Sequence, residues 1–159
     1  MNVTPPSTPP TAAPCQPRRL LLVDDSPPFL DAVARLLGLD PRSTIVGRAR
    51  SGRDALAQVA CLGPDAVLLD VCLPDMSGFE VTRQLIARPG APCVIIIVTL
   101  RDSPEYQAAA AAAGAAGFLT KADVGTDLIA LLDALCPAPG APAGSAVPGT
   151  STSGSPRAT

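Results

Sequence analysis

The chain has 159 residues, of which 47% are hydrophobic, so it is long and apolar enough to form one globular domain. Its formal net charge of −2 argues against a nucleic-acid-binding module, because such modules usually carry a basic face. The sequence contains no histidine, which excludes Ser-His-Asp and Cys-His catalysis, histidine-ligated zinc and a role as a phosphohistidine carrier.

Proline marks both ends of the chain: residues 1–18 hold six of the 19 prolines and residues 137–159 hold five more. Both segments have no apolar period, so they cannot bury enough surface to offset the entropy lost on ordering. We therefore predict disordered tails at 1–18 and 137–159 around a folded domain at 19–136. Each tail is either a solubilising linker or a tether to a partner domain.

Short apolar segments predict five strands. Continuous apolar runs at 20–23, 66–69 and 94–98 indicate strands buried on both faces, as in a parallel sheet. The segments 44–46 and 117–119 show a weaker strand pattern.

Helix signals follow each of these segments, with serine, proline and glycine setting the expected bounds. The predicted helices begin at Ser26-Pro27, begin at Ser51, span 78–87, run from Ser103-Pro104 to Gly114, and begin after Thr126. Five strand–helix repeats with right-handed crossovers predict an α/β fold, a doubly wound, flavodoxin-like (βα)5 sandwich with a five-stranded parallel sheet.

Signals for export or membrane insertion are missing from the sequence. No apolar run approaches the ~20 residues of a membrane span, and the N-terminus lacks the charged start and apolar stretch of a secretory signal. The five cysteines form no Cys-x-x-Cys pair, which favours reduced thiols. We expect a cytoplasmic protein that does not bind membranes.

Polar residues follow four of the five predicted strands. Asp24 and Asp25 follow the first strand, Asp70 the third, Thr99 the fourth and Lys121 the fifth. Open α/β sheets bind ligands beyond the carboxyl ends of their strands, so these side chains are expected to meet at one edge.

These residue types suit phosphoryl transfer. Three carboxylates at one edge repel each other and require a cation or raised pKa values. Carboxylate oxygens suit a hard dication such as Mg²⁺, which also accepts a phosphoryl oxygen. A lysine supplies a point charge for an anionic oxygen, and Lys121 is the single lysine among the 12 Lys and Arg residues. The set predicts a phosphoryl-transfer site with a carboxylate nucleophile.

Each site residue also has a structural interpretation when taken alone. Asp24 and Asp25 are compatible with a helix cap, Thr99 with a structural role after a buried strand, and Lys121 with an exposed charge. Asp70 is the strongest single signal, because it ends a fully apolar run. The order of these residues along the chain carries the functional interpretation.

Four segments carry a resemblance to a known family: LLLVDDSP (20–27), LLDVCLPDMSGFE (68–80), IIIVTL (95–100) and GFLTK (117–121). In order and spacing they resemble the receiver domain of bacterial two-component response regulators, over essentially all of 19–136. The pattern is most similar to receivers of the LuxR/NarL-type subfamily, which precede a helix-turn-helix domain. We expect no such domain here, because a Pro/Gly/Ser/Ala-rich segment follows Cys136.

The resemblance implies the acceptor and metal residues. It implies Asp70 as the phosphoacceptor and Mg²⁺ as the cofactor. It implies Asp24, Asp25, Asp70 and the backbone carbonyl of Cys72 as the metal ligands. Cys72 stands where many receivers have Asn or Met, and it either tunes the lifetime of the acyl phosphate or is a tolerated small residue.

The resemblance also implies the residues that read the phosphoryl group. Lys121 and Thr99 would each bind a phosphoryl oxygen. Phe118 would be an aromatic switch that swings inward when Thr99 moves, although it also suits an ordinary core aromatic. Leu100 is bulkier than the Ala or Gly of many receivers, but large residues are usual there in the LuxR-type subfamily.

The implied function is a phosphorylation-switched signalling protein, not an enzyme. It would take a phosphoryl group from a sensor histidine kinase or a His-phosphotransfer protein and signal, as a stand-alone receiver, by contact with a downstream protein. Mg²⁺-dependent self-phosphorylation from small donors and slow self-dephosphorylation are expected. The alternative is the receiver portion of a DNA-binding transcriptional regulator whose output domain is missing from this chain.

Two further classes are weighed against this reading. A haloacid-dehalogenase-type phosphatase places its nucleophile in a D-x-D motif on the first strand, whereas this strand ends in Asp24-Asp25-Ser26. A degenerate receiver would bind its partner without phosphate, but the complete set of site residues argues against it. Turnover of a generic phosphate ester would separate the phosphatase from the receiver.

Overall fold

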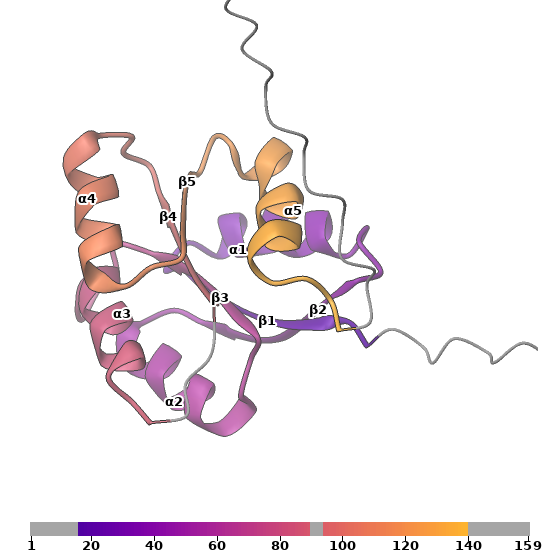
Figure 1. The fold of residues 1–159 in the computed structure, drawn as a ribbon, viewed down its shortest axis with the longest axis horizontal. Coiled ribbons are helices and arrows are strands. Elements are labelled where there is room, and N and C mark those ends of the chain that lie inside the picture. Colours follow the sequence, from indigo (N-terminus) through magenta and orange to yellow (C-terminus); the bar gives the residue numbers. More distant parts are fainter. Residues whose placement is uncertain (1–15, 90–93, 140–159) are drawn as a thin grey trace, which may run out of the picture.

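The computed structural model describes residues 16–89 and 94–139, in which five parallel strands alternate with five helices. The strands are β1 Arg18–Val23, β2 Ser43–Ala49, β3 Ala66–Asp70, β4 Val94–Thr99 and β5 Gly117–Thr120. The helices are α1 Pro27–Leu37, α2 Gly52–Leu62, α3 Gly78–Ile86, α4 Pro104–Ala113 and α5 Val124–Leu135. The strand order is β2-β1-β3-β4-β5, which confirms the predicted flavodoxin-like α/β fold (Figure 1).

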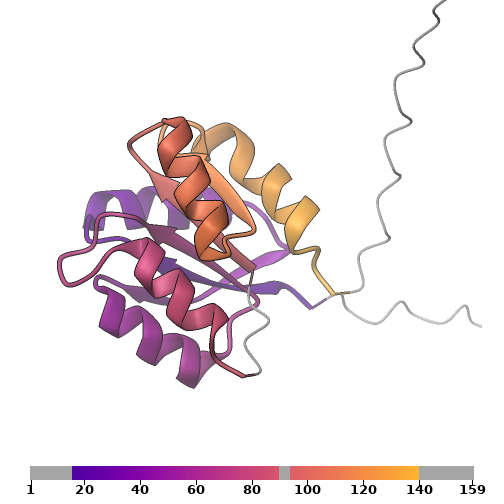
Figure 2. The ribbon, with the colours of Figure 1, turned by 60° about the vertical axis from the view of Figure 1, so that its left-hand side comes forward.

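The sheet is the middle layer of three. Side chains at alternate positions of β1, β3 and β4 pack under α1 and α5 on one face, and the remaining ones pack under α2, α3 and α4 on the other. Figures 1 and 2 show these helices on the two sides of the sheet. Burial on both faces explains the continuous apolar runs of the three central strands. The two strands with weaker patterns, β2 and β5, are the edges of the sheet.

The helix starts follow the sequence signals with two differences. The hydroxyl oxygens of Ser51 and Ser103 accept the N–H groups of Asp54 and Tyr106, as expected of N-caps. Ser26 makes no such bond with its side chain, and the prolines at the first two helical positions supply no N–H there.

The fifth helix begins earlier than predicted. It starts at Val124 with Asp123 as N-cap, whereas the sequence favoured a start after Thr126. Thr126 lies inside the first turn instead, where its hydroxyl donates to the Asp123 carbonyl at 3.1 Å. A threonine that bonds back to the preceding turn looks like a cap in sequence. Gly114 ends α4 as predicted, and its φ of +99° lies in the left-handed region that favours glycine.

Most residues of the predicted tails at 1–18 and 137–159 lie outside the described residues. Cys15 and Cys93 also lie outside them. The first strand begins at Arg18, one residue before the start of the domain predicted at 19–136.

Arg18 is fully buried at the end of the sheet opposite the predicted site. Its guanidinium lies 2.7 Å from a carboxylate oxygen of Asp40 and 2.7 Å from one of Asp133, and it donates to the Cys136 carbonyl at 3.2 Å. Arg42 also pairs with both aspartates. This cluster of Arg18, Asp40, Arg42 and Asp133 joins β1, the α1–β2 connection and the end of α5.

Stability is expected to fall in acid through Asp40. Burial alone would raise the pKa of this carboxyl, but hydrogen bonds from Arg42, Ser43 and Arg18 outweigh burial and hold the pKa well below its usual range. A carboxyl with a depressed folded-state pKa stabilises the fold above its unfolded pKa of about 3.9, and that contribution is lost as the pH falls.

Urea unfolding at several pH values tests this. Between about pH 5 and pH 2 the wild type is expected to lose on the order of 1 kcal/mol more than Asp40→Asn. Asp31→Asn, at an exposed ion pair with Arg48, should behave like the wild type. An equal acid sensitivity of wild type and Asp40→Asn would contradict the assignment.

Candidate functional site

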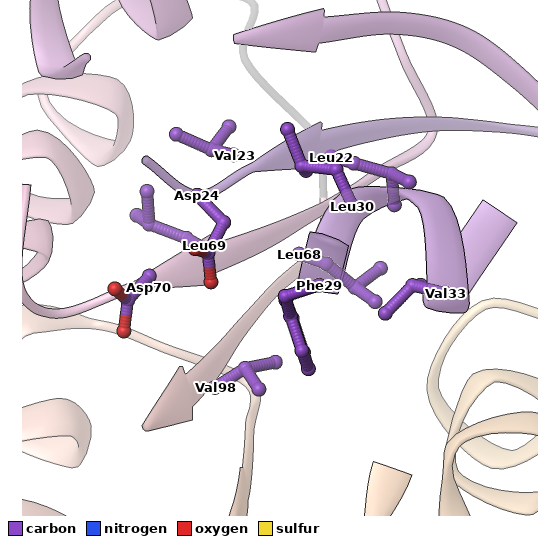
Figure 3. Close-up of a pocket in the computed structure, with 10 residues that line it drawn as sticks. All are labelled: Leu22, Val23, Asp24, Phe29, Leu30, Val33, Leu68, Leu69, Asp70 and Val98. Carbon is purple, nitrogen blue, oxygen red and sulfur yellow. The ribbon is translucent and has the colours of Figure 1, made fainter. Parts of the chain in front are cut away.

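The structure brings the predicted site residues together at the carboxyl ends of the strands. Asp24 directly follows β1, Asp70 ends β3, Thr99 ends β4 and Lys121 directly follows β5. Carboxylate oxygens of Asp24, Asp25 and Asp70 all lie within 4.8 Å of one another. Figure 3 shows Asp24 and Asp70 next to each other at the ends of neighbouring strands. The parallel register of β1 and β3 therefore builds the acidic cluster.

Burial makes two of these carboxylates unusual. Asp24 is 1% exposed and Asp70 is 4% exposed, whereas Asp25 is exposed. One carboxylate oxygen of Asp24 accepts the backbone N–H of Ser26 at 2.8 Å. Burial, and then the nearby Asp24 charge, raises the pKa of Asp70, while Lys121 and backbone N–H groups partly offset this. A buried carboxylate whose charged form is disfavoured is poised to gain from a bound cation.

Lys121 supplies positive charge inside the cluster. Its ammonium nitrogen lies 2.5 Å from Oδ2 of Asp24 and 3.5 Å from Oδ2 of Asp70. Burial lowers the pKa of Lys121, but the two carboxylates outweigh burial and raise it, so the side chain stays charged at neutral pH. Its backbone N–H donates to the Thr99 carbonyl at 2.8 Å, which ties the lysine to the end of β4.

Replacing Asp70 by asparagine is expected to stabilise the protein without added metal. The raised pKa means that the charged carboxylate destabilises the fold at pH values above that pKa. This penalty fades as the pH falls from the folded-state pKa to the unfolded value of about 3.9, and it is absent below that value. We expect Asp70→Asn to raise the free energy of unfolding by on the order of 1 kcal/mol at neutral pH. Urea denaturation at neutral pH and near pH 3 measures this. A gain that persists in acid would point to a cause other than charge.

The remaining predicted residues surround this centre. Thr99 is buried, and its hydroxyl oxygen accepts the backbone N–H of Arg101 at 3.2 Å. Phe118 is half-buried and packs against the core under α2, α3 and α4. Cys72 is exposed and forms an isolated antiparallel bridge with Ser77. The functional roles assigned to these three residues stay predictions.

Two residues at the site were not singled out from the sequence. Asp75, in the loop after β3, accepts the backbone N–H groups of Gly52 and Arg53 at 2.7 and 2.9 Å, which lowers the pKa of its carboxyl. It thereby fastens this loop to the start of α2. Its contacts join residues far apart in the chain, so local sequence carried no signal for them.

Phe29 is the second of these residues. An apolar pocket below the carboxylates contains Phe29 and is lined by residues of β1, α1, β3 and β4 (Figure 3). The centroid of its ring lies 4.5 Å from the ammonium nitrogen of Lys121. In the sequence Phe29 is indistinguishable from the other apolar residues on the inner face of α1.

The acidic cluster fits a hard dication. Its oxygen ligands are those that Mg²⁺ prefers, and its two buried carboxylates are held close together with a single lysine between them.

Among residues 16–89 and 94–139, none of the helices has the length and apolar character that a membrane span requires.

Comparisons with known proteins agree with this geometry. The family model described as the response regulator receiver domain matches residues 20–133. The chain is 39% identical over 106 residues to a protein-glutamate methylesterase/protein-glutamine glutaminase of Symbiobacterium thermophilum, covering 67% of this chain and 29% of that protein. It is 39% identical over 111 residues to the DNA-binding transcriptional activator DevR/DosR of Mycobacterium tuberculosis, covering 69% of this chain and 50% of that protein.

Solved structures give the same result. A two-component response regulator of the LuxR family from Aurantimonas sp. SI85-9A1 matches with a TM-score of 0.70 and 30% identity, over 75% of this chain and 84% of that one. Of the two sequence relatives, the chain spans only 29% of the methylesterase and 50% of the activator. The similarity is confined to 106 and 111 aligned residues, which is about the size of one receiver domain.

Proposed function

Because the chain belongs to the response regulator receiver domain family, we propose that it accepts a phosphoryl group on Asp70 from a phosphohistidine of a sensor kinase or His-phosphotransfer protein. The observation that carries this proposal is the position of Asp70. It is a buried carboxylate at the end of β3, beside two further carboxylates and 3.5 Å from the ammonium of Lys121.

The chemistry is a direct transfer. A carboxylate oxygen of Asp70 attacks the phosphorus, a new O–P bond forms, and the N–P bond to the donor imidazole breaks. The leaving imidazole nitrogen takes its proton from solvent. The product is an acyl phosphate on Asp70, and its hydrolysis returns the carboxylate.

The surrounding residues would stabilise the transferred group. Asp24, Asp25, Asp70 and the backbone carbonyl of Cys72 would hold Mg²⁺, which when bound supplies positive charge beside the phosphoryl oxygens. Lys121 would pair with one phosphoryl oxygen, and the Thr99 hydroxyl would donate a hydrogen bond to another.

The output would be a shift between two conformations. The phosphoryl group favours the state in which Thr99 and Lys121 contact it, and the moving Thr99 leaves space for Phe118 to turn inward. Phe118 lies on edge strand β5, so its reorientation would change an exposed surface. We propose that this surface contacts a downstream protein in the cytoplasm and that the chain acts as a stand-alone receiver without direct binding to nucleic acid or membranes.

A second candidate is a receiver that controls a DNA-binding domain. The 39% identity to DevR/DosR and the likeness to a LuxR-family regulator favour it. An immunoblot of extracts of the source cells, with an antibody raised against this chain, would separate the two. A stand-alone receiver is expected at about 16.0 kDa, and a receiver joined to a DNA-binding domain at a clearly higher mass.

Phosphorylation itself is tested by intact mass after incubation with phosphoramidate, with and without Mg²⁺. The expected result is a single added phosphoryl group that depends on Mg²⁺ and is missing in Asp70→Asn. Asp31→Asn, an exposed aspartate of α1, serves as control and should be modified like the wild type. An adduct on folded Asp70→Asn, or none on the wild type, would refute the assignment.

A further inference from the structure

The aromatic ring of Phe29 faces the lysine of the site. The ring centroid is 4.5 Å from the ammonium nitrogen of Lys121, inside the range of about 6 Å over which a cation is attracted to an aromatic face. The side chain of Lys121 is only 12% exposed, so water weakens this attraction less than it would at the surface. The same ring lines the pocket below Asp24 and Asp70.

The start of α1 fixes the ring in this place. Pro27 and Pro28 occupy the first two helical positions and restrict the backbone there. The N–H of Ser26 donates to Asp24 at 2.8 Å, and the carbonyl of Ser26 accepts the N–H of Leu30 at 3.1 Å. The aspartate that pairs with Lys121 therefore also anchors the turn that carries Phe29.

Metal binding would change what Lys121 contacts. Its nearest partner, Oδ2 of Asp24 at 2.5 Å, belongs to the acidic cluster, so a dication held there competes with the ammonium for that oxygen. The remaining described contacts of the ammonium are Asp70 at 3.5 Å and the ring of Phe29. An uncharged ring holds an ammonium without neutralising it and without binding the metal, so the charge stays available for an anionic oxygen.

We propose that Phe29 is a positioning residue that keeps the Lys121 ammonium beside Asp70 when a dication occupies the carboxylates. The proposal rests on the proposed phosphoacceptor function. It gives the first turn of α1 a role in holding the Lys121 ammonium, which would contact the transferred phosphoryl group. Phe29 touches neither the dication nor the phosphoryl group and acts through Lys121.

Lys121 is the single lysine of the sequence, which allows a direct test. Protein labelled with ¹³C,¹⁵N-lysine gives one ε-methylene signal, which the ring current of Phe29 should move upfield. We expect this displacement in the full chain and also at saturating Mg²⁺. Phe29→Leu should abolish it in both conditions, and Phe29→Tyr, which keeps a ring, should retain it.

A matched control excludes a general effect of losing an aromatic residue. Phe79 packs edge-to-face against Tyr106 on the other face of the sheet, and Phe79→Leu should leave the lysine signal unchanged.

At saturating Mg²⁺, Phe29→Leu should form the phosphoryl adduct about threefold to tenfold more slowly than the wild type.

The outcomes distinguish the positioning role of Phe29 from the proposed phosphoacceptor function. A lysine signal that is the same in wild type and folded Phe29→Leu, or that loses its displacement on adding Mg²⁺, overturns the positioning role. If Phe29→Leu fails to fold, the wild-type Mg²⁺ titration and Phe29→Tyr still decide between these results. A wild type that forms no adduct refutes the proposed function, and the lysine signal then still reports whether Phe29 holds the ammonium.

Discussion

Replacing Arg18 by methionine is expected to lower the free energy of unfolding by about 3 kcal/mol, because removing one partner of a buried ion pair leaves the other charge buried. Arg18 is 0% exposed, and its guanidinium binds the side chains of Asp40, Asp133 and Ser43 and the Cys136 carbonyl. The loss falls at the lower end of the usual range because Arg42 remains paired with Asp40. Even so, it is a large share of the ~5–15 kcal/mol that stabilises a typical domain.

Chemical denaturation of Arg18→Met and Arg48→Met measures this effect. Arg48 pairs with Asp31, but both side chains are about half exposed, at 45% and 60%. Exposed pairs contribute about 0–1 kcal/mol, so Arg48→Met should change stability little. Similar losses in the two variants would show that the buried cluster contributes no more than a surface pair.

The second large effect is expected at Gly78, the first residue of α3. A Cβ atom built there would lie only 2.2 Å from the backbone carbonyl oxygen of Asp70, which has no flexible end that could move aside. The N–H of Gly78 also donates to the Val71 carbonyl at 2.9 Å, so the two backbones are fastened together. We expect Gly78→Ala to cost about 3 kcal/mol of stability and to displace Asp70.

The same substitution at Gly125 provides the control. Gly125 lies in the first turn of α5, and a Cβ atom there would meet nothing within 4 Å. Because alanine favours helix over glycine, Gly125→Ala should raise stability by up to about 1 kcal/mol. Thermal unfolding of both variants gives the comparison. If Gly78→Ala were as stable as the wild type, the close approach of α3 to Asp70 would be ruled out.

The fold could be predicted because burial on both faces leaves a plain mark in the sequence. The runs 20–23, 66–69 and 94–98 became β1, β3 and β4, and the weaker segments became the two edge strands. The start of α5 was predicted wrongly, since Thr126 and Asp123 both resemble helix caps and only the backbone geometry distinguishes them.

The acidic cluster could be predicted for a similar reason. In a parallel sheet the residues that follow the strands meet at one edge, so Asp24, Asp70 and Lys121 could be placed together from their positions alone. Contacts that depend on side-chain direction could not be predicted. Arg18 binds Asp133, which lies 115 residues further along the chain. The ring of Phe29, near the start of the domain sequence, contacts Lys121 near its end.

Locating the phosphoryl group on the chain tests the central claim most directly. The acyl phosphate can be trapped by borohydride reduction, which converts the modified aspartate to homoserine, and the tryptic peptides can then be sequenced by mass spectrometry. Cleavage after Arg53 and Arg83 releases Asp70 in one peptide, and cleavage after Arg19 and Arg35 releases Asp24 and Asp25 in another. We predict homoserine at position 70 alone. Homoserine at position 24 or 25, or at any aspartate other than Asp70, would contradict the account.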